Sequence, residues 1–311
     1  MIYSPLSYPG SKRRVMDKLL PLIPDGIEDW REPFFGSGSV TLAFIQSDKA
    51  RNLKKIIVGD LATEVWAFHQ GCKTVPHEAV AIAKRIFEEH VPTHSKMVEV
   101  GTKDSKYPEL RAKVEEEGVV FWKWLKEIDT TQMTLAERCA RLFLVNRISY
   151  SGLGDCGSLS RDNLCKFRIE HTNRILEISP LLQNIEILNA PFQETMANVD
   201  KEKTFVFLDP PYYAQEDSGL YGRGGDTHRG FPHKEFGEFT KSLECKWLLT
   251  YDDSPYVRRM FRGYDMVPLQ FEYTLAGNKA FDALAGEELL IANYNIQSDA
   301  SLDRDIVAEI I

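Results

Sequence analysis

The spacing of apolar residues changes along the chain and divides it into three zones. In the first zone, which ends near residue 68, Val15–Ile23 and Val40–Gln46 have the apolar spacing of helices. Lys54–Val58 is a short apolar strand, and a further helix is expected over Thr63–Gln70. Strands that alternate with helices in this way favour a parallel α/β sheet.

The second zone, residues 69–164, loses this alternation and has the pattern of helices alone. Apolar residues at helical spacing predict helices over residues 79–87, 114–125 and 135–148. The glycine-rich stretch 149–158 follows and predicts a loop or hairpin. We therefore expect a mainly helical insert at this point of the chain.

The third zone returns to the α/β pattern. Thr204–Leu208 is a nearly continuous apolar strand, as expected at the buried centre of a parallel sheet. Val267–Leu275 and Glu288–Asn295 predict a closing antiparallel hairpin. Further strands are expected at 185–188 and 246–251, and further helices at 173–182, 236–243 and 255–261. The pattern predicts a mostly parallel sheet built from residues 1–68 and 165–296, followed by a polar tail at 297–311.

Composition narrows the class of protein. The chain has 311 residues, of which 43% are hydrophobic, so a packed core and roughly two domains are expected. No apolar run approaches the roughly 18 residues of a membrane-spanning helix, and no apolar leader follows Met1, so neither membrane association nor a signal peptide is expected. Five cysteines without a CxxC pair exclude a disulfide framework and a zinc ribbon, which favours a reducing, cytoplasmic compartment. The seven histidines are expected to be surface or core residues, and no metal is expected.

Charge is unevenly distributed. The net charge of −8 excludes a wholly basic nucleic-acid coat. Between Arg138 and Arg174, however, seven basic residues face only three acidic ones. Such a stretch is either a chance solvated face or a surface that faces phosphates.

The segment best suited to bind a ligand is Asp209-Pro210-Pro211-Tyr212, which directly follows the apolar strand. The two prolines lack backbone donors, so the carbonyls beside them project as free acceptors. Asp209 adds a carboxylate at the carboxyl end of a central strand, where open α/β sheets bind ligands, and Tyr212 adds an aromatic face. Together they suit a planar heterocycle that carries an exocyclic amino group. The alternative is a proline-rich turn in which Asp209 is a local cap.

Two further motifs precede it. Phe35-Gly36-Ser37-Gly38, after Glu32-Pro33, has two glycines that let the backbone approach a carboxylate or phosphate. It lacks the third glycine of the dinucleotide fingerprint, so taken alone it is a weak motif. Asp60 follows Gly38 by about 22 residues, the spacing at which an acid binds ribose hydroxyls. Each motif could also be an ordinary turn, and Tyr8–Lys12 by itself is a turn with a solvated basic cluster.

Taken in order, four segments resemble the Dam-type DNA adenine methyltransferases, which use S-adenosylmethionine. They are Tyr8–Lys12, Glu32–Gly38, Asp60 and Asp209–Tyr212, and the resemblance spans roughly residues 5–295. It implies a Rossmann-like methyltransferase sheet in which the helical insert recognises the target. It also implies double-stranded DNA as substrate, with methyl transfer to the 6-amino group of a flipped adenine at a specific site. The expected setting is a bacterial or phage-infected cell, with a restriction endonuclease as a candidate counterpart.

The resemblance implies a role for each matched residue. The flipped adenine would be held by the catalytic residues Asp209, Pro210, Pro211 and Tyr212. The cofactor would be bound by Tyr8, Gly10, Lys12, Phe35, Gly36, Gly38, Asp60 (at its ribose) and Asp209. DNA would be contacted by Arg147, Arg161, Lys166 and Arg168.

The sequence departs from the family pattern at three places. Pro191 stands where an acid is common, Ala62 stands where an asparagine is common, and Gly152-Leu153 lacks the basic residue that usually follows. The target sequence therefore cannot be transferred from the family. Three alternatives stay open: amino-methylation of cytosine or of an RNA adenine, a nucleic-acid-binding module without turnover, and a dinucleotide-dependent oxidoreductase. The last gives the Asp-Pro-Pro-Tyr segment no role.

Overall fold

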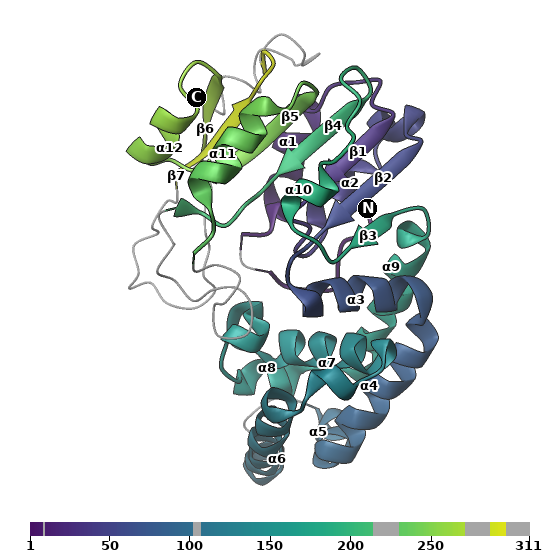
Figure 1. Cartoon of the computed structure of the whole chain (residues 1–311). Coiled ribbons are helices and arrows are strands. Elements are labelled where there is room, and N and C mark those ends of the chain that lie inside the picture. The colour runs from purple at the N-terminus through teal and green to yellow at the C-terminus, as the bar shows by residue number, and fades with distance from the viewer. Residues whose placement is uncertain (9, 102–106, 214–229, 271–286, 297–311) are drawn as a thin grey trace.

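A single seven-stranded sheet with helices on both faces forms the upper part of the molecule, and a group of helices lies below it (Figure 1). The computed structural model describes residues 1–8, 10–101, 107–213, 230–270 and 287–296. The strands are β1 (Asp29–Glu32), β2 (Lys55–Gly59), β3 (Glu186–Leu188), β4 (Thr204–Leu208), β5 (Lys246–Asp252), β6 (Asp265–Gln270) and β7 (Glu287–Ala292). The helices are α1 (Met16–Leu22), α2 (Ser39–Phe44), α3 (Thr63–Thr74), α4 (Pro76–His90), α5 (Thr93–Val100), α6 (Pro108–Glu127), α7 (Leu135–Ile148), α8 (Arg161–Lys166), α9 (Arg174–Leu182), α10 (Phe192–Thr195), α11 (His233–Ser242) and α12 (Pro255–Met260).

The strand order is β3-β2-β1-β4-β5-β7-β6. Strands β1 to β5 pair in parallel, and β7 runs antiparallel between β5 and β6. The mostly parallel sheet with a C-terminal antiparallel pair that the sequence predicts is confirmed. Because the chain first extends the sheet from β1 through β2 to β3 and then continues on the other side with β4, the direction of growth reverses between β1 and β4. Doubly wound sheets bind their ligands at the carboxyl ends of the strands beside such a reversal.

Strand β4 is buried at every position, as its apolar sequence predicts. Strand β1 lies beside it and is almost as buried, yet its sequence is Asp-Trp-Arg-Glu, and the apolar pattern gave no indication of a strand. Its polar groups find partners inside the protein: Arg31 donates to both carboxylate oxygens of Asp29, at 2.7 and 2.8 Å. The Glu32 carboxyl accepts from the backbone N–H of Thr41 at 3.0 Å. Buried polar groups are tolerated when they are paired in this way.

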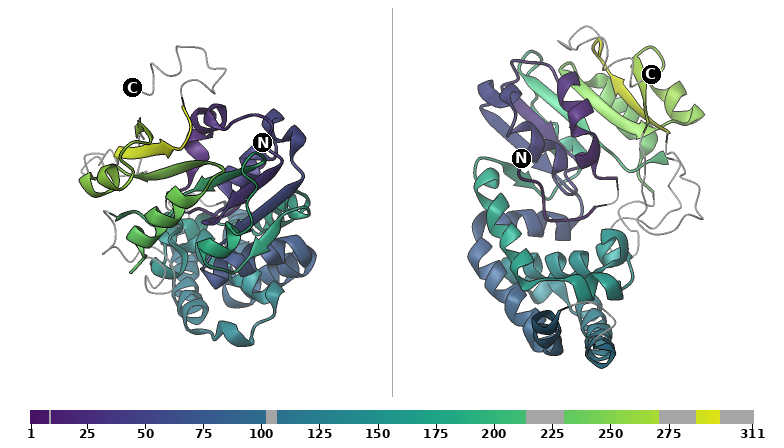
Figure 2. Two further views of the ribbon diagram at one scale, coloured as in Figure 1. Left: turned by 45° about the horizontal axis from the view of Figure 1, so that its top comes forward. Right: turned by 180° about the vertical axis from the view of Figure 1, so that it is seen from behind.

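Alternate residues of the central strands face two separate apolar layers. Phe205 and Phe207 of β4 pack with α1 and α2, and Trp30 of β1 stacks on Phe44 of that layer at 4.1 Å between ring centroids. Helix α1 crosses this face in the rear view of Figure 2. Val206 and Leu208 face the opposite layer, which α10, α11 and α12 cover. The alternation follows from the two-residue period of a strand.

The helical part runs from α3 to α9 and so comes between β2 and β3 in the chain order. In space it lies below the sheet (Figure 1). The helices expected at 79–87, 114–125 and 135–148 lie within α4, α6 and α7, whereas α5 and α8 were not predicted. A capping box at Thr134 and Glu137 begins α7, the buried helix at the centre of this part. One hydrophobic core joins these helices to Phe35, Leu42 and Val58 of the sheet part, so the two parts pack directly on each other.

Some predicted segments lie outside the described residues. These are residues 271–275 of the first hairpin strand and the polar tail at 297–311. Within the described ranges, no helix has both the length and the apolar character needed to cross a membrane. The division of the chain at residues 69 and 164 stays a prediction.

Candidate active site

Asp209 lies at the carboxyl end of β4 and is held from two sides. Its Oδ2 accepts a hydrogen bond from Lys12 Nζ at 2.8 Å, and its Oδ1 accepts one from Thr250 Oγ1 at 2.7 Å. Lys12 belongs to the N-terminal segment and Thr250 to β5, so three distant parts of the chain meet at one carboxylate. The Asp209 side chain is 22% exposed and is therefore reachable from solvent.

The aromatic face predicted beside this carboxylate is present. The Tyr212 ring stacks on Tyr251 with 6.0 Å between centroids and 16° between planes, and its hydroxyl lies 3.3 Å from Asp209 Oδ1. Lys12 Nζ is 5.3 Å from the centre of the same ring. Pro210 is buried and Pro211 half-buried, which makes the turn between the carboxylate and the ring rigid.

Lys12 is only 2% exposed, and carboxylates compensate its charge. Burial by itself lowers the pKa of the ammonium, but the facing carboxylates of Asp209, Glu288 and Glu32 outweigh it and raise the pKa above its usual value. The ammonium also donates to the carbonyl of Gly10 at 2.8 Å, and Gly10 adopts a positive φ of 74°. The cation therefore stays charged beside Asp209 at any working pH.

The glycine loop after β1 approaches the N-terminal segment closely. Gly38 has φ +73°, and a Cβ there would lie 2.7 Å from the Phe35 ring. Gly36 has φ +47°, and a Cβ there would lie 3.1 Å from the ring of Tyr8. Both the backbone conformation and the space therefore require glycine at these two positions.

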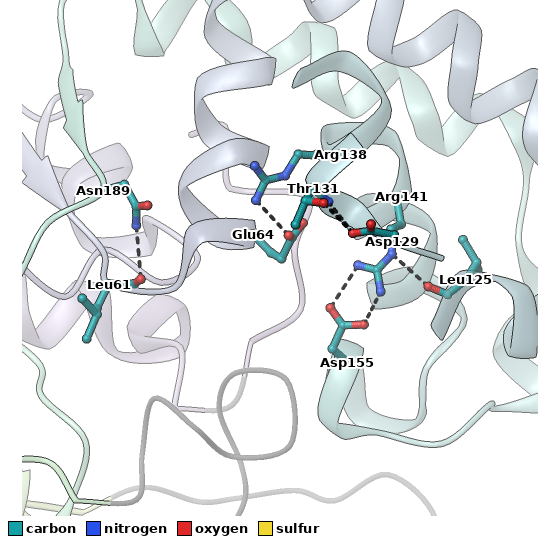
Figure 3. A network of polar contacts seen from close by, with 9 residues as sticks. All are labelled: Leu61, Glu64, Leu125, Asp129, Thr131, Arg138, Arg141, Asp155 and Asn189. Carbon is teal, nitrogen blue, oxygen red and sulfur yellow. Dashed lines mark hydrogen bonds and ion pairs between the residues drawn. The ribbon is translucent and has the colours of Figure 1, made fainter. Parts of the chain in front are cut away.

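Asp60, which follows β2, binds this loop. Its Oδ2 accepts from the N–H of Gly36 and its Oδ1 from the N–H of Ala62, both at 2.8 Å. Burial raises the pKa of the Asp60 carboxyl to about 6, against the lowering effect of these two bonds. Asn189 donates to the backbone carbonyl of Asp60 at 2.9 Å. It also donates to the carbonyl of Leu61 at 3.1 Å (Figure 3). Close by, Pro191 precedes α10 as its N-cap residue, where a further acid is common in the family pattern.

Glu32 lies deeper, at the end of β1. Burial raises the pKa of its carboxyl to about 8, and the hydrogen bonds from Thr41 oppose this only in part. The neighbouring charges of Asp209 and Asp60 raise the same pKa further. Glu32 is therefore mostly protonated at neutral pH, which reduces the negative charge gathered around Lys12.

His69 of α3 is a site residue that sequence reasoning missed. Its Nε2 lies 2.8 Å from the carbonyl oxygen of Gly36, and the ring is fully buried against Phe35. Burial lowers the pKa of this imidazole to about 4, so it is neutral and donates from Nε2 at neutral pH. Gly36 is thus fixed on both sides, by Asp60 at its N–H and by His69 at its C=O. A lone histidine in a helix gave no sequence signal for this contact.

Asn146, near the end of α7, connects the helical part to the N-terminal segment. Its side chain accepts from the N–H of Ser7 at 2.9 Å and donates to the carbonyl of Ser7 at 2.6 Å. It also donates to the carbonyl of Gly152 in the glycine-rich stretch at 2.8 Å. The segment that carries Tyr8 is therefore attached to the predicted target-recognition insert.

The basic stretch is less exposed than its charge count suggests. Arg141 is fully buried and binds both carboxylate oxygens of Asp155, at 2.6 and 3.1 Å, and Arg138 pairs with Glu64 at 2.8 Å (Figure 3). These two cations stabilise the helical part internally. The local excess of positive charge therefore overstates what this surface offers to a phosphate.

The four candidate DNA-contact residues differ in their surroundings. Arg161 and Lys166 are exposed on α8, and Arg161 pairs with Glu115 at 3.2 Å. Arg147 and Arg168 are half-buried. Burial lowers the pKa of Arg147, and the nearby Arg174 lowers it further. Among the residues that the structure describes, neither Arg147 nor Arg174 contacts a carboxylate.

Comparisons with known proteins match the part of the chain that forms this site. The profile of the family described as "D12 class N6 adenine-specific DNA methyltransferase" matches residues 8–275, a span that runs from the N-terminal segment past β6. The type II methyltransferase M1.LlaDCHI of Lactococcus lactis subsp. cremoris is 22% identical over 300 residues, which cover 92% of this chain and 93% of the relative.

Proposed function

Because the chain belongs to the D12 class of N6 adenine-specific DNA methyltransferases, we propose that it transfers the methyl group of S-adenosylmethionine to the 6-amino group of an adenine flipped out of double-stranded DNA. Family membership confirms the enzyme class that the sequence predicts, a DNA methyltransferase that acts on adenine. The cofactor, the flipped base and the role of each residue are our proposal. The observation that carries it is the Asp209 carboxylate, held at 2.8 Å by Lys12 beside the glycine loop.

The residues around the glycine loop fit S-adenosylmethionine. Gly36 and Gly38 have no Cβ, which lets the Tyr8 and Phe35 rings lie against the loop whose Gly36 N–H binds Asp60. Each carboxylate oxygen has two lone pairs, so Asp60 can accept ribose hydroxyls in addition to its two backbone bonds. The bound cofactor supplies a methyl group on a positively charged sulfur. Tyr8, Gly10, Lys12 and Phe35 complete the proposed cofactor site.

The proposed chemistry at Asp209 is positioning together with electrostatic stabilisation. The amino nitrogen of adenine is a weak nucleophile because its lone pair is delocalised into the ring. When Asp209 and the carbonyl of Pro210 accept hydrogen bonds from its two N–H groups, the nitrogen shifts towards a tetrahedral geometry. Its lone pair can then form the bond to the methyl carbon as the methyl–sulfur bond breaks, and one N–H proton leaves the methylated nitrogen towards its acceptor. Such fixed acceptors stabilise the positive charge that develops on the nitrogen. The target atom is out of reach inside a duplex, so the base has to leave the stack, and the Tyr212 ring would support it.

We propose that half-buried arginines near the end of α7 contact the DNA backbone. Burial lowers the pKa of His171, and Arg147, Arg174 and Arg168 lower it further, so these groups lie close together. Guanidinium groups suit phosphates, and phosphate contacts position an enzyme on the duplex. Arg161 and Lys166 on α8 would extend the same surface.

The proposal is tested by transfer of a tritiated methyl group from S-adenosylmethionine to unmethylated DNA, with N6-methylated DNA and RNA as parallel substrates. Asp209→Ala should abolish transfer. Asp48→Asn is the control, since it removes an exposed carboxylate that pairs with Arg51 away from the site. Full activity of Asp209→Ala would refute the assigned catalytic residue. Cofactor binding by the wild type without methylation of any substrate would favour a binding module.

A restriction endonuclease counterpart is part of the proposal, because the similar Lactococcus protein is named a type II methyltransferase. Mapping of modified adenines in the DNA of an expressing host would identify the recognised sequence. An endonuclease that cleaves this sequence only when it is unmethylated would establish the counterpart. Random methylation across the genome would contradict site specificity.

A further inference from the structure

The orientation of Asp209 depends on a residue to which no role has been assigned. Thr250 lies in β5, which pairs in parallel with β4 so that Leu248 is opposite Phe207 and Leu249 is opposite Leu208. The next position along each strand places Thr250 beside Asp209. This register explains why the two side chains meet at 2.7 Å.

Thr250 is the polar exception in an apolar stretch of β5. Leu248, Leu249 and Tyr251 on either side are fully buried, and Thr250 itself is 0% exposed. Valine has nearly the same shape and would satisfy packing without a buried hydroxyl. Burial of a hydroxyl costs free energy unless the hydroxyl makes a hydrogen bond, so packing alone does not explain a threonine at this position.

The Thr250 hydroxyl has one hydrogen and two acceptors within reach. The carbonyl oxygen of Leu208 lies at 3.2 Å and Asp209 Oδ1 at 2.7 Å. The shorter bond to the charged acceptor is the stronger one, so the hydrogen is directed to Asp209. Lys12 holds the other oxygen at 2.8 Å, and two anchors on different oxygens prevent rotation of the carboxylate about its Cβ–Cγ bond.

The hydrogen bonds from Lys12 and Thr250 also leave one acceptor position of the Asp209 carboxylate for a substrate. A carboxylate accepts about four hydrogen bonds. Lys12 occupies one lone pair of Oδ2, whereas Oδ1 receives Thr250 and the longer contact from Tyr212. The second lone pair of Oδ2 is thus the acceptor left to face an amino group. Without Thr250 the carboxylate could pivot around the Lys12 contact, and this lone pair would lose its direction.

We propose that Thr250 is a positioning residue for methyl transfer: its hydroxyl fixes the Asp209 carboxylate so that one lone pair of Oδ2 faces the amino group of the target base. The inference rests on the proposed function, since it presumes that Asp209 accepts a hydrogen from the base. Misplacement of a reacting group by about 1 Å can cost about 100-fold in rate. Thr250 should therefore affect the rate of the chemical step and leave binding unaffected.

The test compares Thr250→Val, Thr250→Ser and wild type in single-turnover methylation with enzyme in excess. Thr250→Val should lower the rate about 10- to 100-fold and keep KM for DNA and for S-adenosylmethionine within about 3-fold. Thr250→Ser retains the hydroxyl and should restore most of the rate. Thr240→Val is the matched control, because Thr240 is a buried threonine of α11 whose Oγ1 has no hydrogen-bond partner within the described part of the chain.

Each outcome decides the inference. A Thr250→Val rate within 2-fold of wild type overturns it, and so does a parallel loss of rate, affinity and melting temperature that Thr250→Ser fails to rescue. If the wild type itself does not methylate DNA, the proposed function fails, and the positioning claim is decided by the crystal structure of Thr250→Val. A rotated or disordered Asp209 carboxylate then supports it, and an unchanged carboxylate refutes it.

Discussion

Glu32 makes folding stability depend on pH in a direction that can be derived from its surroundings. Burial raises the pKa of its carboxyl from 4.5 to about 8. Between these two values the folded chain holds a proton that the unfolded chain has released. The contribution of Glu32 to stability is therefore fully present below pH 4.5 and is lost as the pH rises towards 8.

The size of the effect follows from the shift. Each pKa unit corresponds to about 1.4 kcal/mol, so a rise from 4.5 to about 8 gives at most about 5 kcal/mol. Glu32→Gln keeps the shape of the side chain and an acceptor for the Thr41 N–H but cannot ionise. The variant should gain stability relative to wild type by up to about 5 kcal/mol between pH 4.5 and 8.5.

Urea unfolding at a series of pH values measures this difference by linear extrapolation. Glu202→Gln is the control, since this exposed glutamate in the turn before β4 has no buried environment to lose. Its difference from wild type should be equal at both ends of the pH range. A difference between Glu32→Gln and wild type that stays constant from pH 4.5 to 8.5 would show that Glu32 does not carry the pH dependence, and the reasoning from its burial would be wrong.

Three further substitutions test other contacts. Gly38→Ala places a side chain at a positive φ and against the Phe35 ring. It should lower the free energy of unfolding by more than about 1 kcal/mol, measured by urea unfolding, and should weaken cofactor binding. Unchanged values of both would contradict the clash. His69→Phe should raise the Kd for S-adenosylmethionine about 3- to 10-fold by calorimetry through loss of the bond to Gly36, while His69→Gln, which can still donate, should lie closer to wild type. Arg141→Met leaves its carboxylate partner unpaired and should cost about 3–5 kcal/mol in urea unfolding; a loss below about 1 kcal/mol would mean that the pair contributes little.

The sequence predicts those parts of the fold whose apolar pattern is uninterrupted. The strand at Thr204–Leu208 and the helix at Leu135–Ile148 have the predicted bounds, because most of their inward positions are apolar. Strand β1 was missed because the buried Arg31 donates to the distant carbonyl of Thr195 and the buried Glu32 accepts from Thr41, and no local apolar pattern contains these partners. A sequence pattern records the hydrophobicity of a residue and not the partner that makes its burial possible.

The candidate site shows the same limit. The Asp-Pro-Pro-Tyr segment and the two glycines could be found because their backbone chemistry is unusual. His69 and Thr250 could not, since a lone histidine in a helix and a threonine in an apolar strand resemble ordinary core residues. The charge count likewise could not reveal that Arg141 is enclosed with its own carboxylate.

The contact between Lys12 and Asp209 joins residues that are 197 positions apart in the chain. Nascent polypeptides that end before β4 contain the glycine loop but lack the acid, and no local folding event can bring the two groups together. The proposed catalytic site therefore forms late, after the central strands have paired, because long-range contacts form at a high entropic cost. Activity would accordingly disappear together with the global unfolding transition, which makes turnover a sensitive reporter of complete assembly.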